Sequence, residues 1–261
     1  MPHVRPQGYL QGMDLLDFEQ LTGRTRSHVR ELNELQCTLH PQAAQAFVAL
    51  RAAAATAGLD LAAASSFRDF GRQLLIWNEK YRGRRPLLDL AGAPLDISEM
   101  SAAEIVRAIL HWSALPGASR HHWGTEIDVI DRAALGPGQH AQLIPAEYGA
   151  EGVFRQLDQW LTEHAAGFGF FRPYDRDRGG VQPEPWHLSF APVSAAALTA
   201  LTAEVLAQAL TGVDLAGAEA VWPQLAEIHE RYVRAVAAPS KLALAAPRLG
   251  MKRVSPAARP S

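Results

Sequence analysis

The sequence predicts an α+β fold in which a small antiparallel sheet is flanked by helices and followed by a C-terminal helical hairpin. Two observations predict this class. Segments with helical periodicity and short strand-like runs follow one another without a regular βαβ rhythm, which favours an antiparallel sheet. Two alanine-rich segments near the C-terminus also keep helical periodicity, and we expect them to pack on the domain as a hairpin.

The first half of the chain carries the clearest helix signals. Pro41 opens a segment whose apolar residues recur at helical spacing, and Gly58 is a natural C-terminal stop. Ser101 and Glu104 form a capping box, which predicts a helix that ends near Trp112. We expect helices at about 13–21, 41–58, 69–81 and 101–112, and a strand at 61–66.

The second half of the chain mixes short strands with helices. The run TEIDVID alternates in the manner of a strand. We expect strands at 125–131, 167–172 and 186–190, a helix at about 151–165, and hairpin helices at about 194–210 and 215–236. The predicted organisation is an N-terminal extension (1–40), a central domain (41–193), the helical hairpin (194–236) and a flexible tail (237–261).

Composition excludes several classes of function. A net charge of −2 gives no basic field for nucleic acid or anionic lipid, so we expect no nucleic-acid partner. No stretch reaches the roughly 18 apolar residues of a membrane span. Cys37 is the one cysteine, which rules out an internal disulfide and a thiol-rich zinc site. No secretory signal is visible, which predicts a cytoplasmic protein as written, or a periplasmic or cell-envelope protein if the N-terminus is processed or incomplete.

The run SRHHWGTEID places an imidazole, His121, and a carboxylate, Asp128, seven positions apart. Residues seven apart lie on opposite faces of a regular strand. Both can face one point only if the chain turns near Gly124, which glycine permits. We therefore place His121 on a loop that enters the strand and Asp128 on the strand itself, where a carboxylate among apolar neighbours is costly unless it is paired.

The run EPWH adds a second histidine and a carboxylate close to it. The natural division makes His187 the third metal ligand and leaves Glu184 beside the open metal position. Three protein ligands and one water are the arrangement of a hydrolytic zinc site. Zinc lowers the pKa of that water, and a nearby carboxylate can take its proton.

The run SSFRDFGRQ lies where a strand ends and a helix begins. Arg68 in this run would be placed to bind a planar carboxylate or to steady a carbonyl oxygen. An ordinary salt bridge is the competing interpretation of this arginine.

These three runs together resemble the signature of the D-alanyl-D-alanine metallopeptidases, the VanY-like carboxypeptidases, which are related to the D-Ala-D-Ala dipeptidases and to the hedgehog signalling domain. The resemblance covers about residues 41–192. It implies a zinc peptidase domain with His121, Asp128 and His187 as Zn2+ ligands and Glu184 as the catalytic base. It also implies that Arg68 binds the substrate's carboxylate or carbonyl.

The same resemblance implies further substrate contacts and a substrate class. Ser119 and Gln73 would lie near the bound peptide, which would be a D-alanine-terminated or similar peptide of peptidoglycan. The function implied is a D,D-carboxypeptidase that uses Glu-assisted attack of a zinc-bound water. An endopeptidase of the same fold would have the same ligands.

Glu126 departs from the family, which usually has a small residue at this position. Glu126 and Asp128 lie two apart, so on a strand they project from the same face. Glu126 would then enter the metal cleft and bind a cationic group of the substrate. Alternatively it accepts a hydrogen bond from a ligand histidine or pairs with an arginine, or it lies at a solvated strand end.

Two other classes of metal protein fit part of the pattern. A non-hydrolytic zinc-binding domain would need no base at the open position, and the presence of Glu184 argues against it. Two histidines and a carboxylate also suit Fe(II) in oxygenases. Those sites usually place the first histidine and the carboxylate two apart on one strand, whereas His121 and Asp128 are seven apart.

Overall fold

The computed structural model describes residues 15–90 and 92–245. Two antiparallel sheets form the β part of the fold. The smaller pairs β1 (Arg30–Leu32) with β2 (Cys37–Leu39). The larger has the order β3-β4-β6-β5, with β3 Leu61–Ser65, β4 Glu126–Asp131, β5 Phe170–Phe171 and β6 His187–Phe190. The α+β class with a small antiparallel sheet is confirmed.

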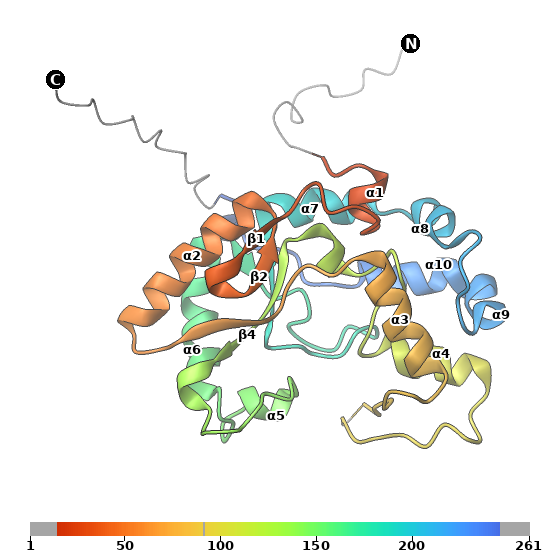
Figure 1. The fold of residues 1–261 in the computed structure, drawn as a ribbon, viewed down its shortest axis with the longest axis horizontal. Coiled ribbons are helices and arrows are strands. Elements are labelled where there is room, and N and C mark those ends of the chain that lie inside the picture. Colours follow the sequence, from red (N-terminus) through yellow and green to blue (C-terminus); the bar gives the residue numbers. More distant parts are fainter. Residues whose placement is uncertain (1–14, 91, 246–261) are drawn as a thin grey trace, which may run out of the picture.

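Helices surround the four-stranded sheet on several sides. Those before β6 are α1 Phe18–Leu21, α2 Pro41–Thr56, α3 Phe70–Tyr81, α4 Ala102–Leu110, α5 Pro145–Tyr148 and α6 Arg155–His164. Those after β6 are α7 Ala191–Ala200, α8 Ala203–Leu210, α9 Ala218–Val221, α10 Leu225–Ile228 and α11 Lys241–Leu244. In Figure 1, α2 and α6 lie on one side of the molecule, and α3, α4 and α8–α10 lie on the other.

The longest helices begin where the sequence supplies caps. Pro41 occupies the first turn of α2, where its missing N–H is not needed. The Asp69 side chain accepts from the backbone N–H of Arg72 at the start of α3. The predicted capping box of Ser101 and Glu104 is present at the start of α4.

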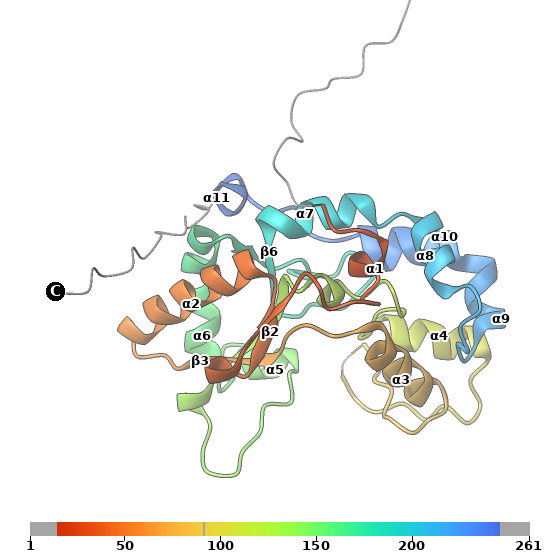
Figure 2. The ribbon, with the colours of Figure 1, turned by 45° about the horizontal axis from the view of Figure 1, so that its top comes forward.

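The C-terminal segment differs from the predicted pair of long helices. Its first half is divided into α7 and α8, which meet at 77°. Its second half is a succession of short turns: α9, the 3₁₀ helix Trp222–Gln224, α10 and the π-helix His229–Arg234. The Thr202 side chain caps α8 and so fixes the break, which apolar periodicity alone does not reveal. Figure 2 shows α7, α8 and α10 following one another along one side of the molecule.

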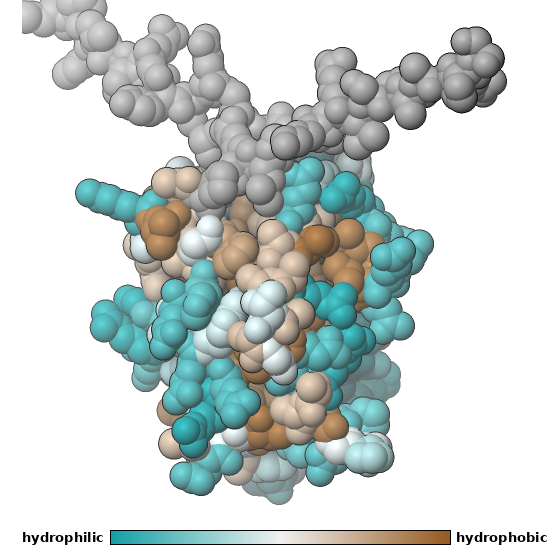
Figure 3. Space-filling view, turned by 90° about the vertical axis from the view of Figure 1, so that its left-hand side faces the viewer, coloured by the Kyte–Doolittle hydropathy of each residue, from teal (hydrophilic) through white to brown (hydrophobic). Residues whose placement is uncertain are grey.

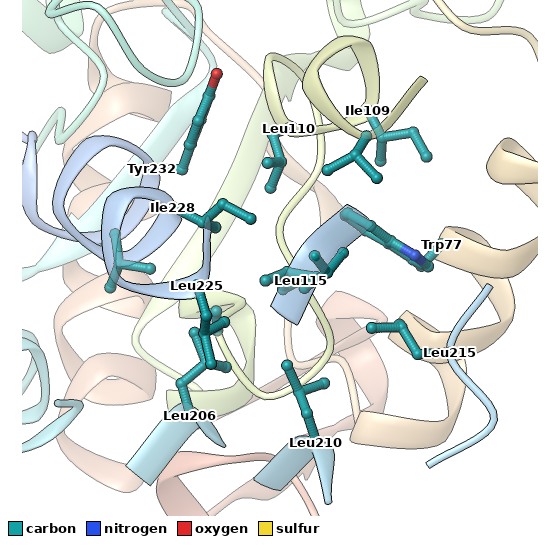
Figure 4. Close-up of a cluster of buried hydrophobic side chains, with 14 of the residues drawn as sticks. Trp77, Ile109, Leu110, Leu115, Leu206, Leu210, Leu215, Leu225, Ile228 and Tyr232 are labelled. Atoms are coloured by element: carbon teal, nitrogen blue, oxygen red, sulfur yellow. The ribbon is translucent and has the colours of Figure 1, made fainter. Parts of the chain in front are cut away.

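Two hydrophobic clusters hold the fold together. One joins the four-stranded sheet to α2 and α6, with Phe47, Phe154 and Phe170 fully buried. The other joins α3 and α4 to the C-terminal helices, with Trp77 and Leu115 at its centre (Figure 4). Residues of the predicted N-terminal extension contribute to both clusters, through Leu21 in the second and Leu39 in the first, although the domain division itself stays a prediction.

No single helix within the described residues is long and apolar enough to cross a membrane, and α7 with α8 reaches that length only as a bent pair. Figure 3 shows the end of the molecule that lies on the left of Figure 1, where hydrophobic residues occupy small areas between hydrophilic ones. Part of the predicted tail, 246–261, and the first residues of the predicted helix at 13–21 lie outside the described residues.

Candidate metal centre

Three polar side chains meet on one face of the larger sheet. His121 lies in the 3₁₀ helix Arg120–Trp123, and Gly124 ends that helix with a φ of 67°. This left-handed turn brings the chain into β4, which carries Asp128. Asp128 and His187 are register partners on β4 and β6, so their side chains project from the same face.

The ligating atoms of His121, Asp128 and His187 all lie within 4.8 Å of one another. The second ring nitrogen of each histidine is engaged elsewhere. His121 Nδ1 lies 2.7 Å from the carbonyl oxygen of Ser66, and His187 Nε2 lies 2.8 Å from Glu126 Oε2. Donation from these atoms turns His121 Nε2 and His187 Nδ1 toward Asp128, at 3.5 Å from its Oδ2 and 3.0 Å from its Oδ1, where a metal ion would be held. Two imidazoles and one carboxylate with orienting partners fit a zinc ion.

The charges at this centre are strongly perturbed. Burial lowers the pKa of His121 to about 3, so this imidazole is neutral, as a metal ligand must be. Burial would also lower the pKa of His187, but hydrogen bonds to Asp128 and Glu126 outweigh it and raise the value to about 10. The carboxylates of Asp128 and Glu126, on either side of His187, therefore favour a positive charge at this position.

Glu126 is fully buried and does not line the cavity described below. Its carboxylate accepts hydrogen bonds from Arg120 Nε and Nη2, both at 3.3 Å, and from the hydroxyls of Thr125 and Ser189 at 2.9 and 2.8 Å. Burial would raise the pKa of Glu126, but Arg120 and the bond to His187 hold it at about 2. Of the alternatives that the sequence leaves open for Glu126, these contacts match the hydrogen bond from a histidine and the pairing with an arginine, and not the entry into the cleft.

A cavity of about 250 Å³ opens over the side chains of His121, Asp128 and His187. Arg68, Ser119 and Glu184 also line it, so these sequence-predicted residues come together around one space. Gln73 does not line it. Its Oε1 accepts from Arg68 Nη1 at 2.9 Å, and its Nε2 donates to the carbonyl oxygen of Ala114 at 2.7 Å. Gln73 thus orients Arg68 rather than facing a ligand.

Glu184 lines this cavity beside the His–Asp–His group. Its Oε2 is 3.5 Å from His187 Nδ1. Burial is the main cause that raises the pKa of Glu184 to about 7, the charge of Asp128 acts in the same direction, and His187 opposes both. A carboxyl group with a pKa near neutrality is suited to accept a proton and return it.

Sequence reasoning missed several residues of the cavity wall, among them a lysine and a tyrosine. Lys80, at the end of α3, and Tyr174, in the loop before β6, both line it. Lys80 follows Gln73 by seven positions, which places the two side chains on one face of a helix. This spacing is the sequence signal that could have placed Lys80 near the site. Tyr174 carries no such signal, because its ring reaches His187, at 5.1 Å between centroids, only through the folding of an irregular loop.

A larger hollow of about 730 Å³ lies between α2 and the turn after β1. It is lined by side chains such as Leu32, Val48 and Arg51, and it contains none of the predicted site residues. The volume of a hollow therefore does not identify the functional site. The predicted site residues line the smaller cavity.

The fold and the site define a class of mixed helix-and-sheet proteins with a His–Asp–His group that can hold a metal. The family model described as VanY, D-alanyl-D-alanine carboxypeptidase, matches residues 36–193. This chain belongs to the VanY D-alanyl-D-alanine carboxypeptidase family. Family membership supports a peptidase that acts on peptidoglycan peptides.

The chain is also similar to individual proteins. An uncharacterized protein of Haemophilus influenzae is 37% identical over 121 residues, which are 46% of this chain and 92% of that protein. Among solved structures, VanYB in complex with D-alanine-D-alanine has a TM-score of 0.46 at 21% identity, covering 71% of this chain and 89% of that one. A mutant vancomycin-resistance D,D-pentapeptidase VanY with Zn(II) has a TM-score of 0.45 at 22% identity, covering 74% and 88%.

Proposed function

We propose that this protein is a zinc-dependent D,D-carboxypeptidase that releases the terminal D-alanine of peptidoglycan peptides. The observation that carries the proposal is the convergence of His121, Asp128 and His187 beside Glu184 in one cavity. Family membership supports the peptide class of the substrate.

The three side chains would hold zinc through His121 Nε2, an oxygen of Asp128 and His187 Nδ1. A bound zinc ion supplies Lewis acidity, which activates water and polarises a carbonyl oxygen. Ser66 and Glu126 would keep each histidine in the tautomer that ligation needs, since each engages the other ring nitrogen.

Glu184 would act as general base and then as general acid. It would accept a proton from the attacking water and later donate it to the leaving amine of D-alanine. Its place beside His187 and its pKa of about 7, raised mainly by burial, suit both steps near neutral pH.

Arg68 would bind the terminal carboxylate or the scissile carbonyl of the peptide. Gln73 and Ser65 accept from its Nη1 and Nη2, at 2.9 and 3.3 Å, and so orient the guanidinium group. Ser119 lines the same cavity and would be a neighbouring polar contact.

The test is incubation of the zinc-loaded protein with muropeptides that end in D-alanyl-D-alanine, followed by mass spectrometry of the products. Loss of one alanine, abolished by a chelator and by Glu184→Gln, is the expected result. That variant should still bind zinc, because Glu184 is not a ligand in this scheme. Cleavage within the peptide would show an endopeptidase instead, and unchanged peptides with fully zinc-loaded protein would overturn the proposal.

A further inference from the structure

Helix α3 places a positively charged side chain, Lys80, at the wall of the cavity, and buried residues hold this helix in place. Gln73, Trp77 and Lys80 follow one another at helical spacing on one face. Trp77 is fully buried in the hydrophobic cluster of Figure 4, and its Nε1 donates to the carbonyl oxygen of Ala216 at 3.0 Å. Gln73 is also buried, so two buried side chains hold α3 in place over the two turns that precede Lys80.

The Lys80 ammonium makes no hydrogen bond or ion pair with any residue in 15–90 or 92–245. Glu184 attracts it at longer range, whereas Arg68 and Arg85 repel it. Burial lowers the pKa of Lys80 to about 8, so the amine is still mainly charged at neutral pH. A partly desolvated cation without a partner is unfavourable, and an anionic group in the cavity would offset that cost.

The charge balance of the cavity points to more than one anion in the substrate. Arg120 is neutralised by Glu126, so the remaining charged walls are Arg68 and Lys80 against Asp128 and Glu184. Adding a divalent zinc leaves a surplus of about two positive charges. One terminal carboxylate removes only half of this surplus.

We propose that Lys80 binds a second carboxylate of the substrate, carried by the residue that precedes the two terminal D-alanines. This inference rests on the proposed function and specifies its substrate class as acidic peptides. A cavity of about 250 Å³ has room for few residues, which places the second carboxylate next to the scissile dipeptide. Arg68 binds the terminal carboxylate or the scissile carbonyl of the substrate, and Lys80 binds the carboxylate of the preceding residue's side chain.

The experiment compares two acetylated tripeptides, Glu-D-Ala-D-Ala and Gln-D-Ala-D-Ala, which differ in one charged group. The zinc-loaded wild type should show a KM about tenfold lower for the glutamyl peptide, as a hydrogen bond between charged groups permits. Lys80→Met should remove this difference by raising the KM of the glutamyl peptide alone, with kcat unchanged within about twofold. Lys80→Arg should keep part of the preference.

Lys241→Met is the matched control, because Lys241 is an exposed lysine on α11 that does not line the cavity. Equal KM values for both peptides in the wild type would overturn the inference. So would a loss of kcat in Lys80→Met that is the same for both peptides. If neither peptide is hydrolysed, the proposed function fails. The affinity of both peptides for zinc-loaded Glu184→Gln, measured by calorimetry, then tests Lys80 separately, and equal Kd values would contradict its role.

Discussion

The buried pair of Arg120 and Glu126 gives a sharp prediction for Glu126→Ala. The two side chains are 3% and 0% exposed, so the change leaves a guanidinium group buried without a counter-ion. Arg120 Nη2 would keep its bond to the Ser189 hydroxyl at 2.6 Å, and Arg120 Nη1 has no partner even in the wild type. His187 and Thr125 would also lose an acceptor.

Breaking a buried pair from one side typically costs about 3–5 kcal/mol of unfolding free energy. We therefore expect Glu126→Ala to lower stability by about 4 kcal/mol, which corresponds to a fall in Tm of about 8–16 °C for a domain of this size. Adding Arg120→Met should recover part of the loss, because the orphaned charge is then gone. The assay is urea unfolding at pH 7 with a chelator present, so that metal binding does not contribute.

Glu227→Ala is the matched control for this experiment. Glu227 pairs with Arg231 at 2.9 Å on the surface, with side-chain exposures of 57% and 43%. Exposed pairs of this kind contribute about 0–1 kcal/mol. A loss for Glu126→Ala as small as that of Glu227→Ala would refute the reasoning that the buried pair supports the site.

Three further variants or probes test other parts of the account. Arg68→Lys keeps the charge but loses the bond to Gln73, so kcat/KM should fall by about a hundredfold at an unchanged Tm; normal turnover, or a loss that follows the Tm, would contradict this role. Gly124→Ala should cost more than about 2 kcal/mol in urea unfolding, because the added carbon would lie 2.9 Å from a backbone nitrogen at a φ of +67°; wild-type stability would contradict it. Burial raises the pKa of the Cys37 thiol to about 11, so a thiol reagent at pH 8 should react only after unfolding; rapid labelling of the native protein would show that the residue is accessible.

Much of the fold is predictable from local signals in the sequence. The helices α2, α3 and α4 appear where the caps and apolar spacing predict them. The β1–β2 hairpin and the breaks between the short C-terminal helices were not predicted. Both depend on packing against residues distant in the sequence. Leu39, for example, is buried in the hydrophobic cluster that joins the four-stranded sheet to α2 and α6, and periodicity does not reveal such contacts.

The candidate site, like the fold, is predictable from the sequence only in part. The spacing of His121, Gly124 and Asp128 implies a turn into a strand, and the structure has that turn at Gly124. The position of Glu126 depends on which residue of β6 faces it, and the register with Ser189 lies beyond any local pattern. The approach of Lys80 to Glu184 likewise requires two distant elements to fold over one cavity.

The most direct test of the central claim is a calorimetric titration of zinc into the metal-free protein. We expect one zinc per chain for the wild type, and a strong loss of affinity in each of His121→Ala, Asp128→Ala and His187→Ala, because three ligands leave no redundancy. Zinc binding that is absent from the wild type, or that is undiminished in all three variants, would contradict the claim that these side chains form the metal centre.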